Sequence, residues 1–307
     1  MVSPLAKAVM SALEETPRPI VTNYDLFRIV WDVYENPGRY PVKIIRRVKA
    51  PGYTQYDRVV TDLGRERILR EDPDFGSYYS LLDTRTRVFR ISENPDAPAE
   101  DIACLVDPFA FVSHLSAMQR YGVTVRQPEA LTLTTPKGKL WAQKRDEKMR
   151  QDYGFDPAEA ELDYFKPLQA ITIPEQLRGR KVHVRHSVRS YGSQPIMDSF
   201  ARIIEIGDLF VQMLDDPDLC GGMEHVLEVW EEHSEVYLDA IIRAVNEAPT
   251  DIIRVRAGYI LGDFLEIDDP RVDAWKSCAQ RGGSRKLDPS KPYGPPFSET
   301  WMLSLNV

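Results

Sequence analysis

The side chains best suited to chemistry in this sequence are cationic, and they gather near its amino-terminal end. Residues 36–70 hold nine Arg or Lys against three acidic residues, in a chain whose formal net charge is −8. Such a concentration of like charge repels itself unless a polyanion neutralises it, which favours binding to nucleic acid phosphates. A basic face that only meets solvent is the other interpretation that the charges leave open.

A helix that begins near Thr54 would present a polar face suited to reading DNA bases. We expect base contacts from Thr54, Gln55 and Arg58, because Gln pairs with adenine and Arg with guanine through two hydrogen bonds. Phosphate contacts are expected from the other cations of this end of the chain: Arg46, Arg47, Lys49, Arg65, and Arg85 and Arg87 near a hairpin. The alternatives are a helix face that meets only water and a charged strand edge that resists aggregation.

A second segment that could bind an anion lies near the carboxyl-terminal end. Two glycines, at 282 and 283, expose backbone N–H groups and are surrounded by Arg281, Ser284, Arg285 and Lys286. This composition is typical of a loop that holds a phosphate, and it marks a possible anion-binding or antitoxin surface. The alternative is a basic loop tied to the acidic helices of its own domain.

Residue patterns of the common catalytic sites do not occur in the sequence. It contains no motif of a P-loop, a serine hydrolase elbow, a zinc protease or a dinucleotide-binding turn. His183 and His186 would point to opposite faces of a strand, and His225 and His233 are about two helical turns apart, which disfavours a shared metal. The three cysteines form no C-x-x-C. We therefore expect no metal, no cofactor and no enzymatic activity, although an active or degenerate nuclease stays an alternative.

The elements expected to position the cationic residues form an amino-terminal domain over residues 1–92. Apolar residues recur at helical spacing in three segments, residues 3–15, 22–35 and 54–63. Strand signals follow at residues 67–70, 77–82 and 87–91. Three helices followed by a small sheet predict a winged helix-turn-helix. This domain carries 15 basic and 12 acidic residues, so its net charge is +3, against −11 for the rest of the chain.

A Pro-rich and acidic run at residues 93–100 predicts a linker, followed by a mixed α/β domain over residues 101–307. In this domain we expect a helix from Asp107 to Gly122 and a charged excursion at residues 144–166, either helical or mobile. The expected strands are 130–134, 139–143, 170–173 and 181–186, and the expected late helices are 198–214, 222–233, 235–246 and 252–265. The predicted fold class is therefore α+β, with a helix-rich carboxyl-terminal part.

The sequence shows neither a signal peptide nor an apolar run long enough to span a membrane. We therefore expect a cytoplasmic protein without a membrane partner.

Three segments resemble motifs of one known family. Residues 111–123, FVSHLSAMQRYGV, are similar to its Y-[IV]-S-x-x-S-A-L-x-x-x-G-[LI] helix, with Met118 in place of the usual Leu. Residues 207–222 are similar to its D-L-[VL]-x-x-P-x-x-x-G-G passage, and residues 256–261, RAGYIL, to its [RK]-x-G-[YF]-L-L helix. In this order the segments resemble the AbiEi family, the antitoxin and transcriptional repressor component of bacterial abortive-infection systems.

The resemblance implies a DNA-binding autorepressor that is also an antitoxin in phage defence. It implies binding to inverted repeats in the protein's own promoter, with two copies on one pseudo-palindrome as a possible dimer on DNA. It also implies an antitoxin domain that counteracts a nucleotidyltransferase-like toxin by opposing its effect, without a requirement for direct contact. A ligand-sensing winged-helix regulator and a nuclease-like nucleic-acid enzyme are the alternatives.

Overall fold

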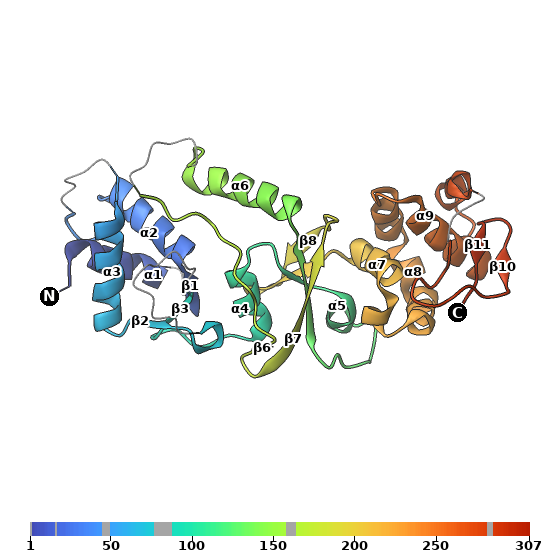
Figure 1. The fold of residues 1–307 in the computed structure, drawn as a ribbon, viewed down its shortest axis with the longest axis horizontal. Helices are drawn as coiled ribbons and strands as arrows, with labels where there is room; N and C mark the ends of the chain where they lie inside the picture. Colours follow the sequence, from blue (N-terminus) through green and yellow to red (C-terminus); the bar gives the residue numbers. More distant parts are fainter. Residues whose placement is uncertain (1, 16, 45–49, 77–87, 158–163, 281–284) are drawn as a thin grey trace. The chain divides into compact units, whose positions relative to one another are not determined.

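The computed structural model describes residues 2–15, 17–44, 50–76, 88–157, 164–280 and 285–307 (Figure 1). The chain divides into two compact units. The first comprises Met1–Ala110 with Thr135–Val182, and the second comprises Phe111–Thr134 with His183–Val307. This division differs from the predicted one, in which residues 101–307 form a single domain, because residues 135–182 pack with the amino-terminal elements. Helices and mixed sheets together make an α+β fold, which confirms the predicted class.

The amino-terminal part of the first unit, residues 1–92, is called the head here. Its elements are α1 (Pro4–Glu15), β1 (Ile20–Thr22), α2 (Asn23–Glu35), α3 (Tyr53–Arg65), β2 (Leu69–Glu71), the 3-10 helix η1 (Pro73–Phe75) and β3 (Val88–Ile91). The strands form an antiparallel sheet in the order β1-β3-β2. The three helices lie where the apolar periodicity predicts them. The predicted strand at residues 77–82 lies outside the described residues.

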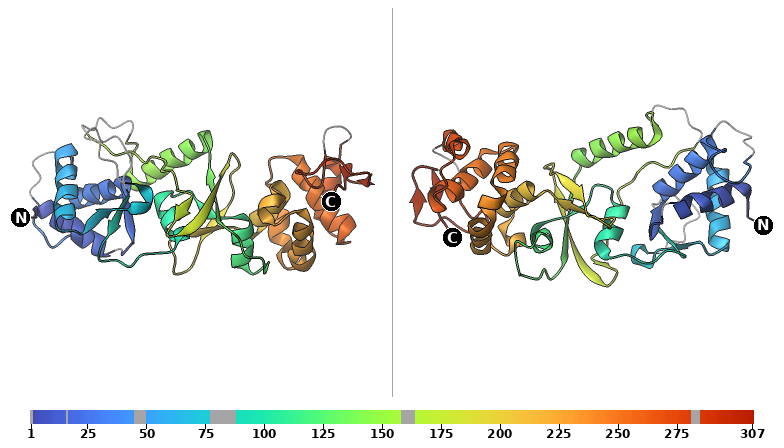
Figure 2. Two further views of the ribbon diagram at one scale, coloured as in Figure 1. Left: turned by 60° about the horizontal axis from the view of Figure 1, so that its bottom comes forward. Right: turned by 180° about the vertical axis from the view of Figure 1, so that it is seen from behind.

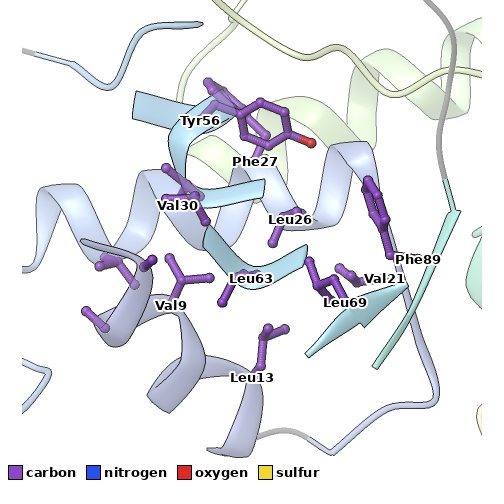
Figure 3. Packing of buried hydrophobic residues seen from close by; sticks show 14 of the residues in the cluster. Val9, Leu13, Val21, Leu26, Phe27, Val30, Tyr56, Leu63, Leu69 and Phe89 are labelled. Carbon is purple, nitrogen blue, oxygen red and sulfur yellow. The ribbon is translucent and has the colours of Figure 1, made fainter. Parts of the chain in front are cut away.

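The core of the head lies between the three helices and the sheet (Figure 3). Val9 of α1, Val30 of α2 and Leu63 of α3 are fully buried and pack into one cluster. Thr22 fixes the start of α2, because its side-chain oxygen accepts a hydrogen bond from Asp25 N at 3.1 Å. Burial of one apolar stripe from each helix therefore determines which face of α3 is left to solvent.

Residues 139–153 form helix α6 (Lys139–Tyr153), so the strand predicted at residues 139–143 is wrong. The helix buries only Met149 completely and depends on contacts with α2. Asp152 accepts hydrogen bonds from Tyr24 Oη at 2.7 Å and from Arg28 Nη1 at 2.9 Å. Tyr153 packs edge-on against Tyr24. The charged segment is thus helical up to Tyr153, and residues 158–163 lie outside the described residues.

The first unit is completed by α4 (Ala99–Val106), β6 (Gln176–Leu177) and the first residues of β7 (Arg180–Ser187). Strands β6 and β7 form a tight antiparallel hairpin. The predicted linker begins as a turn bound to the head, because Asn94 Nδ2 donates to Arg18 O at 2.8 Å, and it ends in the first turn of α4. The strand predicted at residues 170–173 is absent, since these residues are irregular.

The second unit combines short strands with a group of helices (Figure 2). Its sheet contains β4 (Phe111–Val112), β5 (Leu131–Pro136), β8 (Ser193–Pro195) and β9 (Arg202–Ile204); β4 is antiparallel to β5 and parallel to β9, which pairs with β8. The helical elements are α5 (His114–Tyr121), α7 (Ile206–Asp215), η2 (Pro217–Cys220), α8 (Met223–Asn246), α9 (Asp251–Gly258), the π-helical η3 (Tyr259–Phe264), α10 (Pro270–Asp273) and η4 (Ala274–Cys278). A ribbon of β10 (Phe297–Ser298) and β11 (Leu303–Ser304) ends the chain.

Several predicted boundaries in the second unit are wrong. The helix expected from residue 107 is the strand β4 followed by α5, and the helix expected from residue 198 begins at Ile206 because Arg202–Ile204 forms β9. The two helices predicted on either side of Ser234 are one helix, α8. Ser234 lies inside α8, where it is buried and its hydroxyl donates to Trp230 O at 2.5 Å.

Candidate nucleic-acid interface

The exposed face of α3 is polar and carries two arginines, Arg58 and Arg65, together with the acidic Asp57. Thr54, Arg58, Thr61 and Arg65 are all exposed, and their spacing of four, three and four residues places them on one side of the helix. Leu63 lies on the opposite side and is fully buried. Three of the predicted site residues, Thr54, Arg58 and Arg65, are thus exposed on one side of α3.

The start of α3 involves the predicted base-reading residue Gln55. Its Oε1 accepts a hydrogen bond from the backbone N–H of Gly52 at 3.0 Å, so the side chain closes the first turn of the helix. Gln55 is also partly buried, whereas its neighbour Thr54 is exposed. A contact between the Gln55 amide and a base would therefore compete with this cap for the same oxygen.

A buried carboxylate fixes α3 against α1. Asp62 accepts a hydrogen bond from Ser3 N at 2.8 Å, and Arg65 Nη1 lies 3.9 Å from its Oδ1. Burial alone would raise the pKa of Asp62, but the hydrogen bonds from Ser3 and the nearby charges of Arg58 and Arg65 lower it. The carboxylate is thus ionised at neutral pH. It pairs with Arg65 and leaves the side chain of that arginine 63% exposed.

Two further exposed cations follow α3 in the chain and were not among the predicted site residues. Arg67 lies in the turn after the helix with φ of 60°, and Arg70 lies in β2; both are exposed. Neither forms an ion pair with another described residue. The signal was present in the sequence, since both belong to the basic run at residues 36–70, but only the structure shows that both are exposed. We call Thr54, Arg58, Thr61, Arg65, Arg67 and Arg70 the α3 face.

Most of the other predicted contacts cannot be placed. Arg46, Arg47, Lys49, Arg85, Arg87, Arg281 and Ser284 lie outside the described residues. Arg285 and Lys286 are described, and both bind backbone carbonyls of their own unit: Arg285 Nη1 donates to Cys278 O at 2.6 Å, and Lys286 Nζ donates to Lys291 O at 2.6 Å. Lys286 also lies over the ring of Tyr293. These contacts agree with a loop tied to its own domain, through carbonyls instead of acidic helices.

A Ser, a His and an Asp lie close together at the start of α5. His114 Nδ1 is 2.9 Å from Ser113 Oγ, and its Nε2 is 3.8 Å from Asp216 Oδ2. These are the residue types of a hydrolase triad, but Ser113 is fully buried and its oxygen accepts a hydrogen bond from Thr134. Burial lowers the pKa of His114 against the opposing effect of Asp216. A substrate cannot reach this hydroxyl, so the group stabilises the unit.

The other two family-like segments also occupy packing positions. Gly207 of α7 lies against α8 so closely that an added Cβ would be 2.2 Å from Ala240 O. Gly258 ends α9 beneath the ring of Trp301, again with no room for a Cβ. Arg256 is buried and donates hydrogen bonds to the carbonyls of Leu214 at 2.8 Å and Lys286 at 2.8 Å. These residues join the helices to the carboxyl-terminal segment.

In the part of the chain that the structure describes, no group of three or more His, Cys, Asp or Glu could hold a metal ion. Among the same residues, no helix is both long and apolar enough to cross a bilayer.

No protein-family model matches the chain, and no curated protein matches it. Among solved structures, the crystal structure of the RV2827C protein from Mycobacterium tuberculosis is similar, with a TM-score of 0.45 and 14% sequence identity. The match covers 99% of this chain and 92% of that one. A likeness of this degree does not define a family for the chain.

Proposed function

We propose that the head is a winged helix-turn-helix that binds double-stranded DNA through the α3 face. The observation that carries this proposal is the solvent-exposed row of Thr54, Arg58, Thr61 and Arg65 on α3, continued by Arg67 and Arg70. The order of elements, α1-β1-α2-α3-β2-β3 with a sheet in the order β1-β3-β2, supports it, because that order belongs to winged helices. In this arrangement α3 enters the major groove.

Each cation of the α3 face has a role that its position suggests. Arg58 lies in the middle of the exposed row, where its planar guanidinium can pair with guanine through two hydrogen bonds. Arg65, Arg67 and Arg70 lie at the carboxyl-terminal end of α3 and beyond it, where they can grip phosphates on one strand. The base contact would carry sequence discrimination, and the phosphate contacts would carry salt-dependent affinity.

The biological function that we propose is transcriptional autorepression combined with antitoxin activity. The resemblance of three segments to the AbiEi family suggests it, and so does the charge difference between the head, at +3, and the rest of the chain, at −11. The protein would bind inverted repeats in its own promoter as two copies. Its second unit would counteract a nucleotidyltransferase-like toxin in the cytoplasm by opposing the toxin's effect. No catalytic step by this chain is part of the proposal.

A binding assay with the full chain and a duplex of its own promoter tests DNA recognition. Arg58→Ala should weaken binding by about 1–3 kcal/mol and reduce discrimination against a scrambled duplex, because a base contact is lost. Arg65→Ala should weaken binding to both duplexes alike and reduce the salt slope by about one. Arg150→Ala is the control, since it removes an equal charge from an exposed site on α6. Unchanged binding by Arg58→Ala and Arg65→Ala, or an equal loss in the control, would contradict the assignment of the α3 face.

Growth measurements test the antitoxin activity separately. Co-expression of the full chain with the product of the adjacent gene should restore growth, and the Arg58→Ala variant should restore it equally, because protection is assigned to the second unit. Loss of protection in that variant would show that DNA binding itself is required.

A further inference from the structure

One arginine from outside the head reaches the strands that follow α3. Arg178 lies in the two-residue turn of the hairpin β6–β7, next to Gly179. Both turn residues have positive φ, 52° for Arg178 and 74° for Gly179, which is the conformation of a type I′ turn. Asn, Asp and Gly are the residues that usually occupy the first of these positions. Arg178 has a backbone conformation that an arginine does not favour, so the contacts of its side chain are the feature to explain.

The Arg178 guanidinium binds three carboxylates of the first unit. Its Nη2 is 2.6 Å from Asp72 Oδ2, its Nε is 2.8 Å from Asp96 Oδ1, and its Nη1 also pairs with Asp74. The backbone N–H of Arg178 adds a hydrogen bond to Asp74 Oδ2 at 3.0 Å. The side chain of Arg178 is 9% exposed and that of Asp72 is fully buried. Because its donors are already used and shielded, this arginine is unsuited to bind a phosphate.

The three carboxylates lie close in sequence to the strands that follow α3: Asp72 and Asp74 come after β2, and Asp96 comes after β3. Asp72 directly follows β2, the strand of Arg70, and its Oδ1 accepts a hydrogen bond from Asp74 N at 3.0 Å. Asp72 also accepts a hydrogen bond from Arg90 Nε of β3 at 3.0 Å. In the sheet, Arg70 lies directly opposite Arg90. The hairpin therefore holds both strands next to an exposed cation of the α3 face.

We propose that Arg178 is a positioning residue for DNA recognition: from the β6–β7 hairpin, it fixes β2 and β3 and thereby the register of the α3 face on the duplex. The inference rests on the proposed function. The DNA-binding surface then depends on a residue outside the head, because Arg178 lies 106 positions after Asp72, the residue that it binds.

The contacts of Arg178 with Asp72, Asp74 and Asp96 are called the clamp here. Loss of the clamp should weaken sequence-specific binding to DNA more than non-specific binding. Loosening β2 and β3 removes no cation of the α3 face, so salt-dependent binding to any duplex persists. Base readout depends on the exact placement of side chains, and a misplaced contact costs about tenfold in affinity, as a mismatched base pair does. A phosphate-binding arginine would show the reverse pattern, with an equal loss on all sequences and a lower salt slope.

The test uses fluorescence anisotropy with the full chain, its own promoter duplex and a scrambled duplex, at about 50 to 200 mM salt. Arg178→Ala should lower affinity for the promoter by about tenfold and leave the scrambled duplex and the salt slope unchanged. Arg178→Lys should recover part of the lost promoter affinity, since the Lys ammonium keeps the positive charge but lacks the planar set of donors of the guanidinium. Arg180→Ala is the matched control, because Arg180 belongs to the same hairpin and pairs with Glu100 instead of the clamp. If Arg178→Ala does not fold, Asp74→Asn removes one partner and should give a smaller loss of the same kind.

Unchanged promoter affinity, or a salt slope reduced by about one, would overturn the inference. Failure of the wild-type chain to bind any duplex would refute the proposed function, and hydrogen exchange would then test the clamp by itself. Arg178→Ala should speed amide exchange in residues 69–75 and 88–91, and Arg180→Ala should not. Equal exchange rates in these strands would overturn the clamp as well.

Discussion

A single methyl group at position 258 should reverse the usual effect of replacing glycine by alanine in a helix. Ala is favoured over Gly by about 1 kcal/mol in a helix interior, because Gly loses more backbone entropy. At Gly258 an added Cβ would lie 2.2 Å from two carbons of the Trp301 ring. Trp301 is fully buried, and its Nε1 donates a hydrogen bond to Asp263 Oδ1 at 2.9 Å. If the ring moved to avoid the new Cβ, it would press on other buried atoms and weaken its hydrogen bond with Asp263.

The magnitude follows from these competing effects. Overpacking of a buried ring costs about 1–3 kcal/mol, and weakening its hydrogen bond costs about 1 kcal/mol more. Subtracting the gain in helix propensity, of about 1 kcal/mol, leaves a net loss of about 1–3 kcal/mol for Gly258→Ala. Gly262 provides the control, because its Cβ would make an ordinary contact of 3.5 Å with the same ring. Gly262→Ala should be neutral or stabilise by up to about 1 kcal/mol.

Differential scanning calorimetry of the two variants and the wild type measures this difference. The melting temperature of Gly258→Ala should fall by roughly 2–12 °C, at about 2–4 °C for each kcal/mol, while Gly262→Ala stays at or slightly above the wild type. A Gly258→Ala protein that melts at or above the wild type would refute the packing of Trp301 on α9. The same result would remove the structural reason for the glycine in the third family-like segment.

Two further measurements examine other buried groups. Burial alone would raise the pKa of Asp72, but hydrogen bonds from Arg178 and Arg90 lower it, so its stabilising effect is complete above about pH 4 and is lost as the pH falls through the folded-state pKa. Thermal melts between about pH 7 and 3 should show that Asp72→Asn is less stable at neutral pH and loses less stability in acid; parallel curves would contradict this. Burial also raises the pKa of the Cys220 thiol, whereas Cys278 is only half-buried. Alkylation of the folded protein, followed by mass spectrometry, should modify Cys278 first, and equal rates at Cys220 would count against its burial.

Packing explains the residue types found in the family-like segments, without reference to any reaction. Gly207 and Gly258 allow close approach of α8 and Trp301, and Arg256 binds carbonyl groups from two separate parts of the second unit. Their residue types mark positions where packing permits few alternatives. A chain that retains these segments retains the unit's helix packing, and its chemistry must be tested separately.

Local patterns in the sequence were sufficient for the helices of the head. Apolar residues at helical spacing predict α1, α2 and α3, and Thr22 caps α2 through a hydrogen bond that spans only three residues. The same patterns predict the exposure of Thr54 and Arg58, because the buried stripe of an amphipathic helix defines its opposite face. These features depend on contacts between near neighbours in the chain, and near neighbours are what a sequence displays directly.

Tertiary structure alone decided which residues outside the head support it. Residues 139–143 form the start of α6, although their pattern suggested a strand, and the ring of Trp141 in this stretch packs against Phe109, a residue distant in sequence. Arg178 meets Asp72 across more than a hundred positions. A charged residue in a sequence carries no mark of the partner that it will meet, since ion pairs and ring contacts over such separations exist only once the chain has closed on itself.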